Sequence, residues 1–405
     1  MISVAEAIRI IREQTPALPF ETVALAEALG RTLAEDVSAD SDLPPFDRAQ
    51  MDGYAVRAVD TQGAPVRLRV VGESAAGRGW HQLMRAGEAV RIMTGAPVPE
   101  GADSVQQVEL TRELDQGALV EIDKATIHGQ FIVTRASEIK AGATVLRAGE
   151  RINAAMMAGL ASFGHARVRV GQRPRVAVLA TGTELVPVTE QPGEDQIRDS
   201  NTYSLSAYAQ LAGARVETLP LACDEPELLQ REIADAATRS DLLILSGGVS
   251  MGIYDFTKAA LRALGAEIFF ERISLRPGKP TVFARLTPPH PTLVFGLPGN
   301  PVSVSVTFNL FARAALLAMQ GSTEDVMLEE QAILTHNVKG ALERESYLPA
   351  QLRSDASGRL MAEPLKWGGS SDFVAFARAT ALINVPPGVK TLEAGTLVRV
   401  LRLPG

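Results

Sequence analysis

The chain has 405 residues, and its 40 Lys and Arg against 47 Asp and Glu give a net charge of −7. Its one cysteine, Cys223, rules out an intrachain disulfide framework and an all-cysteine zinc site. The acidic balance argues against a duplex-DNA binder, which normally carries a basic surface, but it leaves anionic small molecules as possible ligands.

The other compositional values, 46% apolar and 21% charged residues, are those of a globular protein. Residues 1–14 carry charges throughout, so they contain no signal-peptide core. The longest stretch without a formal charge, 286–312, is interrupted by prolines and cannot form one membrane helix. We therefore expect a cytoplasmic protein that binds neither membrane nor nucleic acid.

The N-terminal segment predicts a helix, because Ser3 and Glu6 form a candidate capping box. A second short helix should end near Gly30. Residues 41–53 break all periodicity and predict a long loop. From there to residue 138, short β-like runs alternate with Gly and Pro turns.

A helix capped by Asn153 follows, and then one more strand. After the β-rich stretch, the sequence thus returns to a helical pattern like that of the N-terminal segment. We infer a discontinuous domain I, residues 1–45 and 139–173, with an inserted β-rich domain II, residues 46–138.

Residues 174–323 alternate apolar strands with helices, which predicts a three-layer α/β/α domain III with a parallel-rich sheet covered on both faces. The expected strands are 175–180, 215–219, 241–245, 267–270, 281–284 and 292–295, and the expected helices are 201–211, 225–237, 255–264 and 300–319. Residues 324–405 have no strong helical pattern and predict a C-terminal β-barrel, domain IV. The predicted fold class is therefore multidomain, with α/β and β parts.

Four loops of unusual composition fall at the carboxyl ends of these strands, where open α/β sheets bind ligands. Residues 180–184 (ATGTE) and 246–252 (SGGVSMG) each follow a strand. Glycines let backbone amides face a ligand, and a following helix terminus favours an anion. A tight strand-to-helix turn explains both loops equally well.

The other two loops carry cations or prolines. Residues 276–280 (RPGKP) bracket a Pro-Gly turn with two cations, which suits phosphate or another oxyanion. The alternative for this loop is a solvated hairpin. Residues 296–301 (GLPGNP) precede a long helix, and helix capping explains Asn300 but not the clustered prolines and glycines.

Four carboxylates follow elements of the same domain: Glu184, Asp199, Asp224 and Asp255. Carboxylates beside cations suggest Mg²⁺ bridging to phosphate oxygens, although any one of them is explained by capping or solvation. The five histidines have no metal-binding spacing, and no nucleophile elbow or Walker phosphate loop is present.

Sequence motifs along nearly the whole chain are in the order typical of one family. They are 44–55 (PPFDRAQMDGYA), 91–99 (RIMTGAPVP), 181–185 (TGTEL), 199–201 (DSN), 246–250 (SGGVS), 276–280 (RPGKP) and 296–301 (GLPGNP). In these motifs, the chain resembles the MoeA and gephyrin E-domain family, the molybdopterin molybdenumtransferases.

This resemblance implies four domains and a homodimer in which domain II of one subunit faces domain III of the other. It implies that adenylylated molybdopterin and molybdate give molybdenum cofactor and AMP, with a divalent cation, usually Mg²⁺. It also implies two kinds of partner, a molybdopterin adenylyltransferase and molybdenum-cofactor chaperones.

The loops and the resemblance together give the expected site. The catalytic residues would be Asp52, Glu138, Glu184, Asp224, Asp255 and Lys279, of which Glu184, Asp224 and Asp255 would hold the metal or orient water. Asp52 and Thr94 would come from the partner subunit, and the amides of Gly247 and Gly248 would hold phosphate. The full set expected to bind pterin nucleotide or oxyanion is Thr94, Thr181, Gly182, Asp199, Ser246, Gly247, Gly248, Ser250, Arg276, Pro280, Pro298, Asn300, Pro301 and Ser370.

The sequence also departs from the family pattern. Val133 stands at a usual arginine position and Glu138 at a usual aspartate. Pro349 stands at a second usual arginine position, for which Arg344 or Arg353 could substitute. These departures motivate an alternative, a divergent paralogue that binds pterin nucleotide as a scaffold without inserting metal. A nucleotide-processing hydrolase is a weaker alternative, because the inserted and last β domains argue against it.

Overall fold

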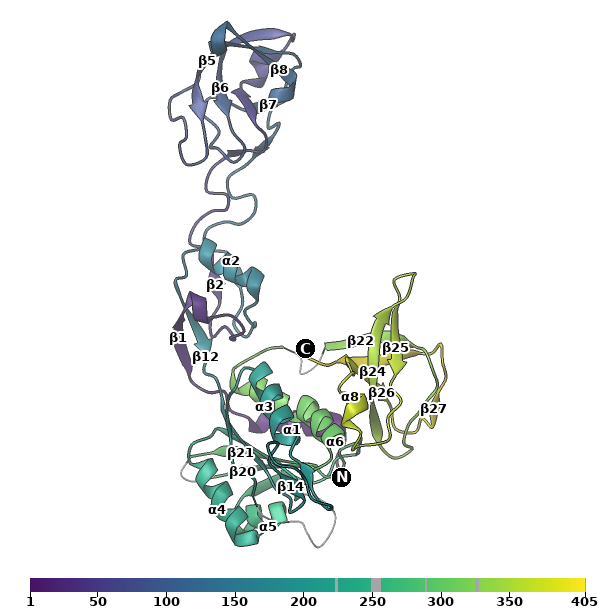
Figure 1. Ribbon diagram of the computed structural model, residues 1–405. Helices are drawn as coiled ribbons and strands as arrows, with labels where there is room; N and C mark the ends of the chain where they lie inside the picture. The colour runs from purple at the N-terminus through teal and green to yellow at the C-terminus, as the bar shows by residue number, and fades with distance from the viewer. Residues whose placement is uncertain (223–224, 249–255, 288–289, 325–327, 405) are drawn as a thin grey trace. The chain divides into compact units, whose positions relative to one another are not determined.

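The computed structural model describes residues 1–222, 225–248, 256–287, 290–324 and 328–404 (Figure 1). The chain divides into two compact units. The main unit comprises Met1–Glu35, Ala148–Met157 and Arg167–Gly405, and the inserted unit comprises Asp36–Arg147 and Ala158–Ala166. We describe each unit by itself.

The main unit begins with α1 (Val4–Gln14). The Ser3 hydroxyl accepts a hydrogen bond from the Glu6 amide at 3.1 Å, as the capping signal predicts. The strand β1 (Phe20–Ala24) comes next in sequence and pairs antiparallel with β12 (Arg167–Gly171). Between them in sequence, the second predicted helix is only a 3₁₀ turn, η1 (Leu25–Glu27).

A mixed sheet forms the centre of the main unit. Its strands, in spatial order, are β16 (Arg215–Thr218), β13 (Arg175–Ala180), β17 (Leu242–Ser246), β21 (Thr292–Leu297), β20 (Val282–Leu286) and β18 (Glu267–Phe270). The first four run parallel, and β20 runs antiparallel to both of its neighbours. The connection 287–291 is too short for the helical crossover that a parallel β20–β21 pair would need, so these strands pair antiparallel.

Helices cover both faces of this sheet, as expected for the three-layer arrangement (Figure 1). Alternate strand residues point to opposite faces, and both sets are apolar. Val176 and Ile244 pack in one cluster with residues of α1, while Leu179 and Leu243 pack in the other. The helices after the first are α3 (Asn201–Leu211), α4 (Pro226–Ala237), α5 (Phe256–Ala263), α6 (Pro301–Thr307) and α7 (Arg313–Met319).

The helical stretch Pro301–Met319 is continuous through a π-helical segment, η5 (Phe308–Ala312). Its length and apolar composition would allow it to cross a membrane. However, 89% of it is buried inside the structure, which is the position of a core helix.

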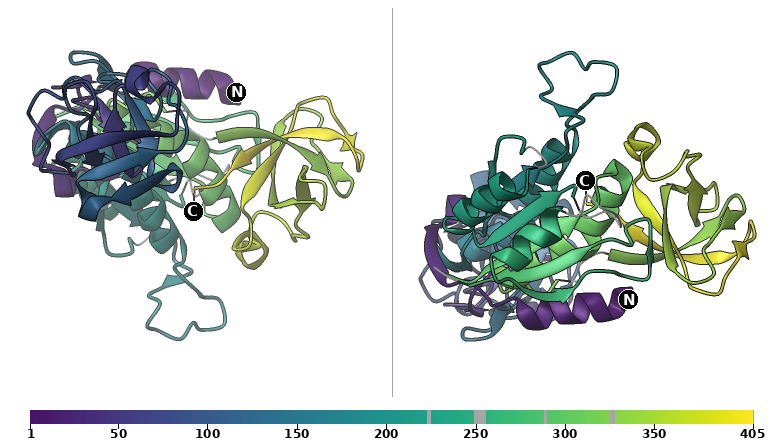
Figure 2. Two further views of the ribbon diagram at one scale, coloured as in Figure 1. Left: turned by 90° about the horizontal axis from the view of Figure 1, so that it is seen from above. Right: turned by 90° about the horizontal axis from the view of Figure 1, so that it is seen from below.

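The C-terminal part of the main unit is a closed barrel, which lies beside the helices and sheet in both views of Figure 2. The ring closes because β24 pairs with β25 on one side and with β26 on the other. Its members are β24 (Glu345–Ser354), β25 (Leu360–Pro364), β22 (Leu328–Leu334), β28 (Leu397–Arg402) and β26 (Ala381–Val385). The short elements around it are β19 (Leu275–Arg276), β23 (Val338–Lys339), β27 (Thr391–Leu392) and α8 (Phe373–Phe376). The predicted β-barrel is confirmed.

The inserted unit is built on one six-stranded sheet. Its order is β7 (Ser104–Gln107), β4 (Gly53–Val56), β6 (Glu88–Ile92), β5 (Val66–Ser74), β9 (Leu119–Ile122) and β8 (Thr111–Leu114). Two small ladders pair segments far apart in sequence: β2 (Val37–Ser38) with β11 (Thr144–Leu146), and β3 (Arg48–Ala49) with β10 (Ile132–Val133). The predicted helix near Asn153 is α2 (Ala154–Ser162), which begins in the main unit and ends in the inserted unit. Within the main unit, the Met156 amide donates to the Asn153 side chain at 2.9 Å.

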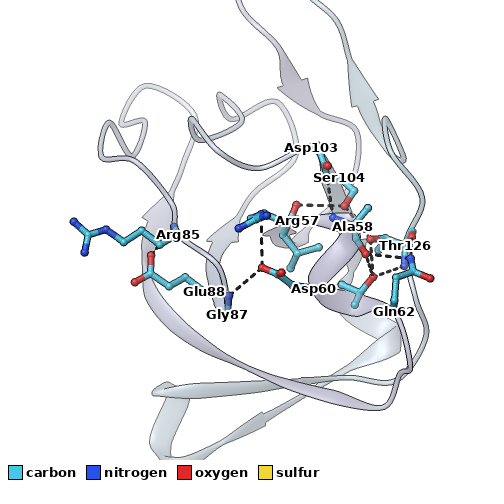
Figure 3. A network of polar contacts seen from close by, with 12 residues as sticks. Arg57, Ala58, Asp60, Gln62, Arg85, Gly87, Glu88, Asp103, Ser104 and Thr126 are labelled. Carbon is cyan, nitrogen blue, oxygen red and sulfur yellow. Dashed lines mark hydrogen bonds and ion pairs between the residues drawn. The ribbon is translucent and has the colours of Figure 1, made fainter.

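A network of polar contacts stabilises the inserted unit around η2 (Ala58–Thr61) (Figure 3). Thr61 and Thr126 are fully buried, and the Thr126 amide donates to the Thr61 hydroxyl at 2.9 Å. Asp103 accepts from the Ala58 amide, and Asp60 accepts from the Gly87 amide. These bonds satisfy buried polar groups, so the network is structural. The remaining 3₁₀ turns are η3 (Val108–Leu110) and η4 (Asp115–Gly117).

Candidate functional site

Two adjoining pockets in the main unit contain most of the described residues that the sequence singles out. We call the first, of about 670 Å³, the strand-end pocket, and the second, of about 500 Å³, the cationic pocket. Asn300 lines both of them. The strand-end pocket is lined by Thr181, Glu184, Leu185, Pro192, Gln196, Ile197, Arg198, Asp199, Ser200, Asn201, Ser246, Gly299, Asn300, Pro301, Ser371 and Phe373. The cationic pocket is lined by Arg276, Pro277, Gly278, Lys279, Pro280, Pro298, Asn300, Ser303, Arg344, Trp367, Gly368, Gly369 and Ser370.

The polar wall of the strand-end pocket lies at the carboxyl ends of the strands. Thr181 follows β13, and Ser246 ends β17. Asn201, at the start of α3, donates to the Ser246 hydroxyl at 2.9 Å and to the Gly299 carbonyl at 2.6 Å. Asp199 is 5% exposed, and its carboxylate accepts from the Thr202 amide at 3.1 Å. This carboxylate therefore caps α3 in addition to lining the pocket.

Apolar side chains of Leu185, Ile197 and Phe373 also line the strand-end pocket, together with Gln196 and Arg198. The two-residue strands β14 (Leu185–Val186) and β15 (Ile197–Arg198) pair in parallel at its edge. Ile197 is 58% exposed and Phe373 is 54% exposed, although both line the pocket. A concave site with apolar side chains and a few convergent polar groups suits a flat organic ligand with polar edges.

The glycines after β17 make a tight turn. Gly247 has a φ of +97°, and a Cβ there would lie 2.2 Å from the Thr181 carbonyl oxygen. The Gly247 amide donates to the Leu297 carbonyl at 3.2 Å, continuing the ladder between β17 and β21. This bond already occupies the Gly247 N–H, so the expectation that the amides of Gly247 and Gly248 hold phosphate stays a prediction. Neither Gly247 nor Gly248 is among the lining residues of the two pockets.

The cationic pocket contains the 276–280 turn that the sequence identified. Pro277 and Gly278 are buried, so the turn is not a solvated hairpin. Gly278 has a φ of +110°, and a Cβ there would lie 2.4 Å from the Thr307 methyl carbon. The turn therefore packs closely on α6 while Arg276 and Lys279 line the pocket. Two cations beside hydroxyl groups suit an oxyanion.

Asn300 does not cap its helix with its side chain, contrary to the simplest explanation from sequence. No side-chain capping bond is present, and the carboxamide nitrogen donates to the Ser370 hydroxyl at 2.8 Å. The Ser370 carbonyl accepts from the Val302 amide at 3.0 Å. These two bonds join α6 to the loop of the barrel region that contains Ser370.

Asp372 fixes that loop. The Gly368 and Ala375 amides donate to its carboxylate at 2.8 and 3.1 Å. These backbone hydrogen bonds lower the pKa of Asp372 below its ordinary value, the bond from Gly368 having the larger effect. Asp372 therefore holds the Ser370 loop as the cap of α8.

Asp52, Thr94 and Glu138 lie in the inserted unit. Asp52 Oδ1 accepts from both the amide and the hydroxyl of Thr94, at 2.6 and 2.7 Å. The backbone bond, followed by the hydroxyl bond, lowers the pKa of the Asp52 carboxyl. Glu138 pairs with Arg48 at 3.0 Å, and Val133 is the ladder partner of Arg48.

The remaining predicted residues divide into two groups. Gly182 is among the described residues but lines neither pocket. A Cβ at this position would lie 2.6 Å from the Glu184 carboxylate. Asp224, Ser250 and Asp255 lie outside the described residues. Of the three predicted metal ligands, only Glu184 is described, and the described part of the chain contains no group of three His, Cys, Asp or Glu side chains that could hold a metal ion. The predicted magnesium site therefore stays a prediction.

Sequence reasoning missed several pocket residues. Trp367, Ser303 and Phe373 had no recognisable signal, because they reach the pockets through tertiary packing. Arg344 and Arg353 were equivalent candidates in the sequence. The structure distinguishes them: Arg344 lines the cationic pocket, whereas Arg353 lies 3.7 Å from Glu363 and donates to Gln351.

Family models match three consecutive parts of the chain. Residues 2–164 match the MoeA N-terminal region (domain I and II), residues 177–318 a probable molybdopterin binding domain, and residues 331–403 the MoeA C-terminal region (domain IV). These matches cover most of the chain.

Full-length relatives agree with these matches. The chain is 35% identical to a molybdopterin molybdenumtransferase of Bacillus subtilis (strain 168), over 99% of this chain and 94% of that protein. It is 34% identical to the protein of the same name from Staphylococcus aureus (strain COL), over 99% and 95%. A molybdopterin biosynthesis MoeA protein from Pyrococcus horikoshii has a solved structure that is 32% identical, with a TM-score of 0.81 over 100% of both chains. The chain therefore belongs to the MoeA family of molybdopterin molybdenumtransferases.

Proposed function

We propose that this protein inserts molybdate into adenylylated molybdopterin and releases AMP, giving molybdenum cofactor. The observation that carries the proposal is the adjacency of the two pockets, which share Asn300. One pocket has the shape and lining for an organic ring system, and the other has the charge for an oxyanion. Such a pair of pockets would hold the two reactants next to each other, which is the main requirement of a transfer reaction.

In this account the strand-end pocket holds the organic part of the substrate. Ser246 and Asn201 would orient its polar edge, and Leu185 and Phe373 would pack against its faces. The cationic pocket would hold molybdate and the neighbouring phosphate oxygens. Lys279 and Arg276 would offset the negative charge that accumulates there, from a turn whose backbone is packed against α6.

We also propose the finer features that the family resemblance implies. Mg²⁺, with Glu184 as a ligand beside Asp224 and Asp255, would neutralise phosphate charge. The chain would act as a cytoplasmic homodimer in which Asp52 and Thr94 complete the site of the partner subunit. Its four domains would follow the predicted boundaries, and it would receive its substrate from a molybdopterin adenylyltransferase and deliver its product to molybdenum-cofactor chaperones.

The test is AMP release from adenylylated molybdopterin and Mg²⁺, with and without molybdate. We expect release that depends on molybdate. Lys279→Ala should lower the rate by roughly 100-fold, because a fixed cation at the reacting centre contributes about that much. Lys390→Ala is the matched control, because Lys390 is exposed and lines neither pocket.

Tight binding of the pterin nucleotide without molybdate-dependent release would contradict the proposal. That result would instead identify the non-inserting paralogue that Val133 and Pro349 motivate. Full activity of Lys279→Ala would contradict the role of the cationic pocket while leaving the reaction itself intact.

A further inference from the structure

We infer that Arg344 binds the oxyanion in the cationic pocket together with Lys279 and Arg276, an inference that rests on the function proposed above. Arg344 lines this pocket, whereas the sequence left it beside Arg353 as one of two possible substitutes for the usual arginine at Pro349. Four observations support the inference: its place in the backbone, the pocket it shares with Arg276, its lack of an ion-pair partner among the described residues, and the donors beside it.

The backbone around Arg344 is fixed to the 276–280 turn. The parallel ladder between β19 and β24 pairs Leu275 with Glu345 and Arg276 with Ser346. The Glu345 amide donates to the Ser274 carbonyl at 3.0 Å, and the Ser274 hydroxyl donates to the Glu343 carbonyl at 2.7 Å. These bonds flank Arg344 on both sides in sequence, so its main chain cannot move independently of the turn.

Arg344 and Arg276 line the same pocket from two paired segments. Arg344 forms a β-bridge with Ala341 and directly precedes β24, in which Ser346 is the ladder partner of Arg276. The residue between Arg344 and Ser346 is Glu345, which has other partners. Its carboxylate accepts from the Tyr347 hydroxyl at 3.0 Å and from the Asn384 amide at 2.6 Å. The neighbouring carboxylate therefore does not neutralise Arg344.

The charge of the pocket is unbalanced. Its lining includes Arg276, Lys279 and Arg344 and no Asp or Glu. No carboxylate of the described residues forms an ion pair with any of these three side chains, whereas nearby arginines of the barrel do form such pairs, as Arg402 does with Glu330. Three like charges around one cavity repel one another unless an anion lies between them.

The uncharged donors beside these cations fit the same ligand. The Ser370 hydroxyl oxygen accepts from Asn300, which leaves its own hydrogen free to donate into the pocket. A planar guanidinium offers paired N–H donors that match two oxygens of one anion, which an ammonium group does not. A tetrahedral dianion such as molybdate presents this arrangement of oxygens.

The test measures molybdate binding through Trp367, which lines the same pocket. The chain has two tryptophans, so Trp80→Phe leaves Trp367 as the only one. In this background, Arg344→Gln should raise the dissociation constant of molybdate at least tenfold. Arg353→Gln, the matched control from β24, should leave the constant unchanged, because Arg353 does not line the pocket and pairs with Glu363 instead. Arg344→Lys should fall between the two, since it keeps the charge but loses the paired donors.

The activity assay separates this inference from the proposed function. If Arg344 holds the oxyanion, Arg344→Gln should raise the KM for molybdate at least tenfold with little change in kcat. An active parent protein with unaltered molybdate binding in Arg344→Gln would overturn the inference alone. A parent that never releases AMP in response to molybdate would overturn the proposed function. If Arg344→Gln fails to fold, Arg344→Lys decides, and a dissociation constant equal to that of the parent would count against the paired donors.

Discussion

Asp52 and Thr94 illustrate how single residues determine the ionisation of a carboxylate in the inserted unit. They are far apart in sequence, and both were expected at the site from separate motifs. The structure joins them by two hydrogen bonds to one carboxylate oxygen. Both bonds stabilise the ionised form of Asp52, so they lower its pKa and fix its orientation at the same time.

Removing the hydroxyl bond should raise the pKa of Asp52. Thr94→Val keeps the backbone donor and the side-chain shape, so the shift should be upward but incomplete. A carboxyl titration by NMR in the parent and in Thr94→Val checks this prediction. An unchanged or lower pKa in the variant would contradict it.

The sign of the pH effect follows from the same bonds. A pKa lowered in the folded state means that the pair stabilises the fold above the ordinary carboxyl pKa and that this contribution is lost as pH falls through the folded value. At neutral pH, Asp52 is ionised with or without the Thr94 hydroxyl. Any loss of activity in Thr94→Val near pH 7 would therefore report on the position of the carboxylate and not on its charge.

At the scale of elements, the 276–280 turn depends on one glycine. Gly278 has a positive φ and lies against Thr307 of α6. Gly278→Ala would force a methyl group into that contact and would strain the backbone. We expect the free energy of unfolding to fall by about 1–3 kcal/mol and molybdate binding to weaken.

Gly299→Ala is the control for this variant. Gly299 does not have a positive φ, and the nearest atom to an added Cβ is 3.8 Å away. Its free energy of unfolding should change by no more than about 0.5 kcal/mol. Chemical denaturation of both variants makes the comparison, and equal effects would show that close packing on α6 does not hold the turn.

Most elements could be predicted from local pattern. The strands β13, β17 and β18 and the helix α3 occupy the predicted ranges to within a residue, because continuous apolar runs and caps mark them. The direction of β20 depended instead on the length of its connection to β21. The side chain of Asn300 was assigned to capping, and its real partner, Ser370, lies in a different domain of the sequence prediction.

For the whole molecule, the sequence identifies candidate ligand-binding loops better than it predicts which distant segments lie beside them. Arg276 and Lys279 stood out because they bracket a turn in one short motif. Arg344 did not, since the ladder between β19 and β24 connects segments that no local pattern relates. Choosing between Arg344 and Arg353 needed the ion pair of Arg353 with Glu363, which is a tertiary contact.

The central claim is that molybdate enters the cationic pocket beside Lys279. A crystal soaked with tungstate, an isosteric oxyanion with strong anomalous scattering, tests this claim most directly. We predict one anomalous peak within hydrogen-bonding distance of the Lys279 ammonium and of the Arg276 and Arg344 guanidinium groups. A fully occupied tungstate site elsewhere, with no peak in the cationic pocket, would contradict the account.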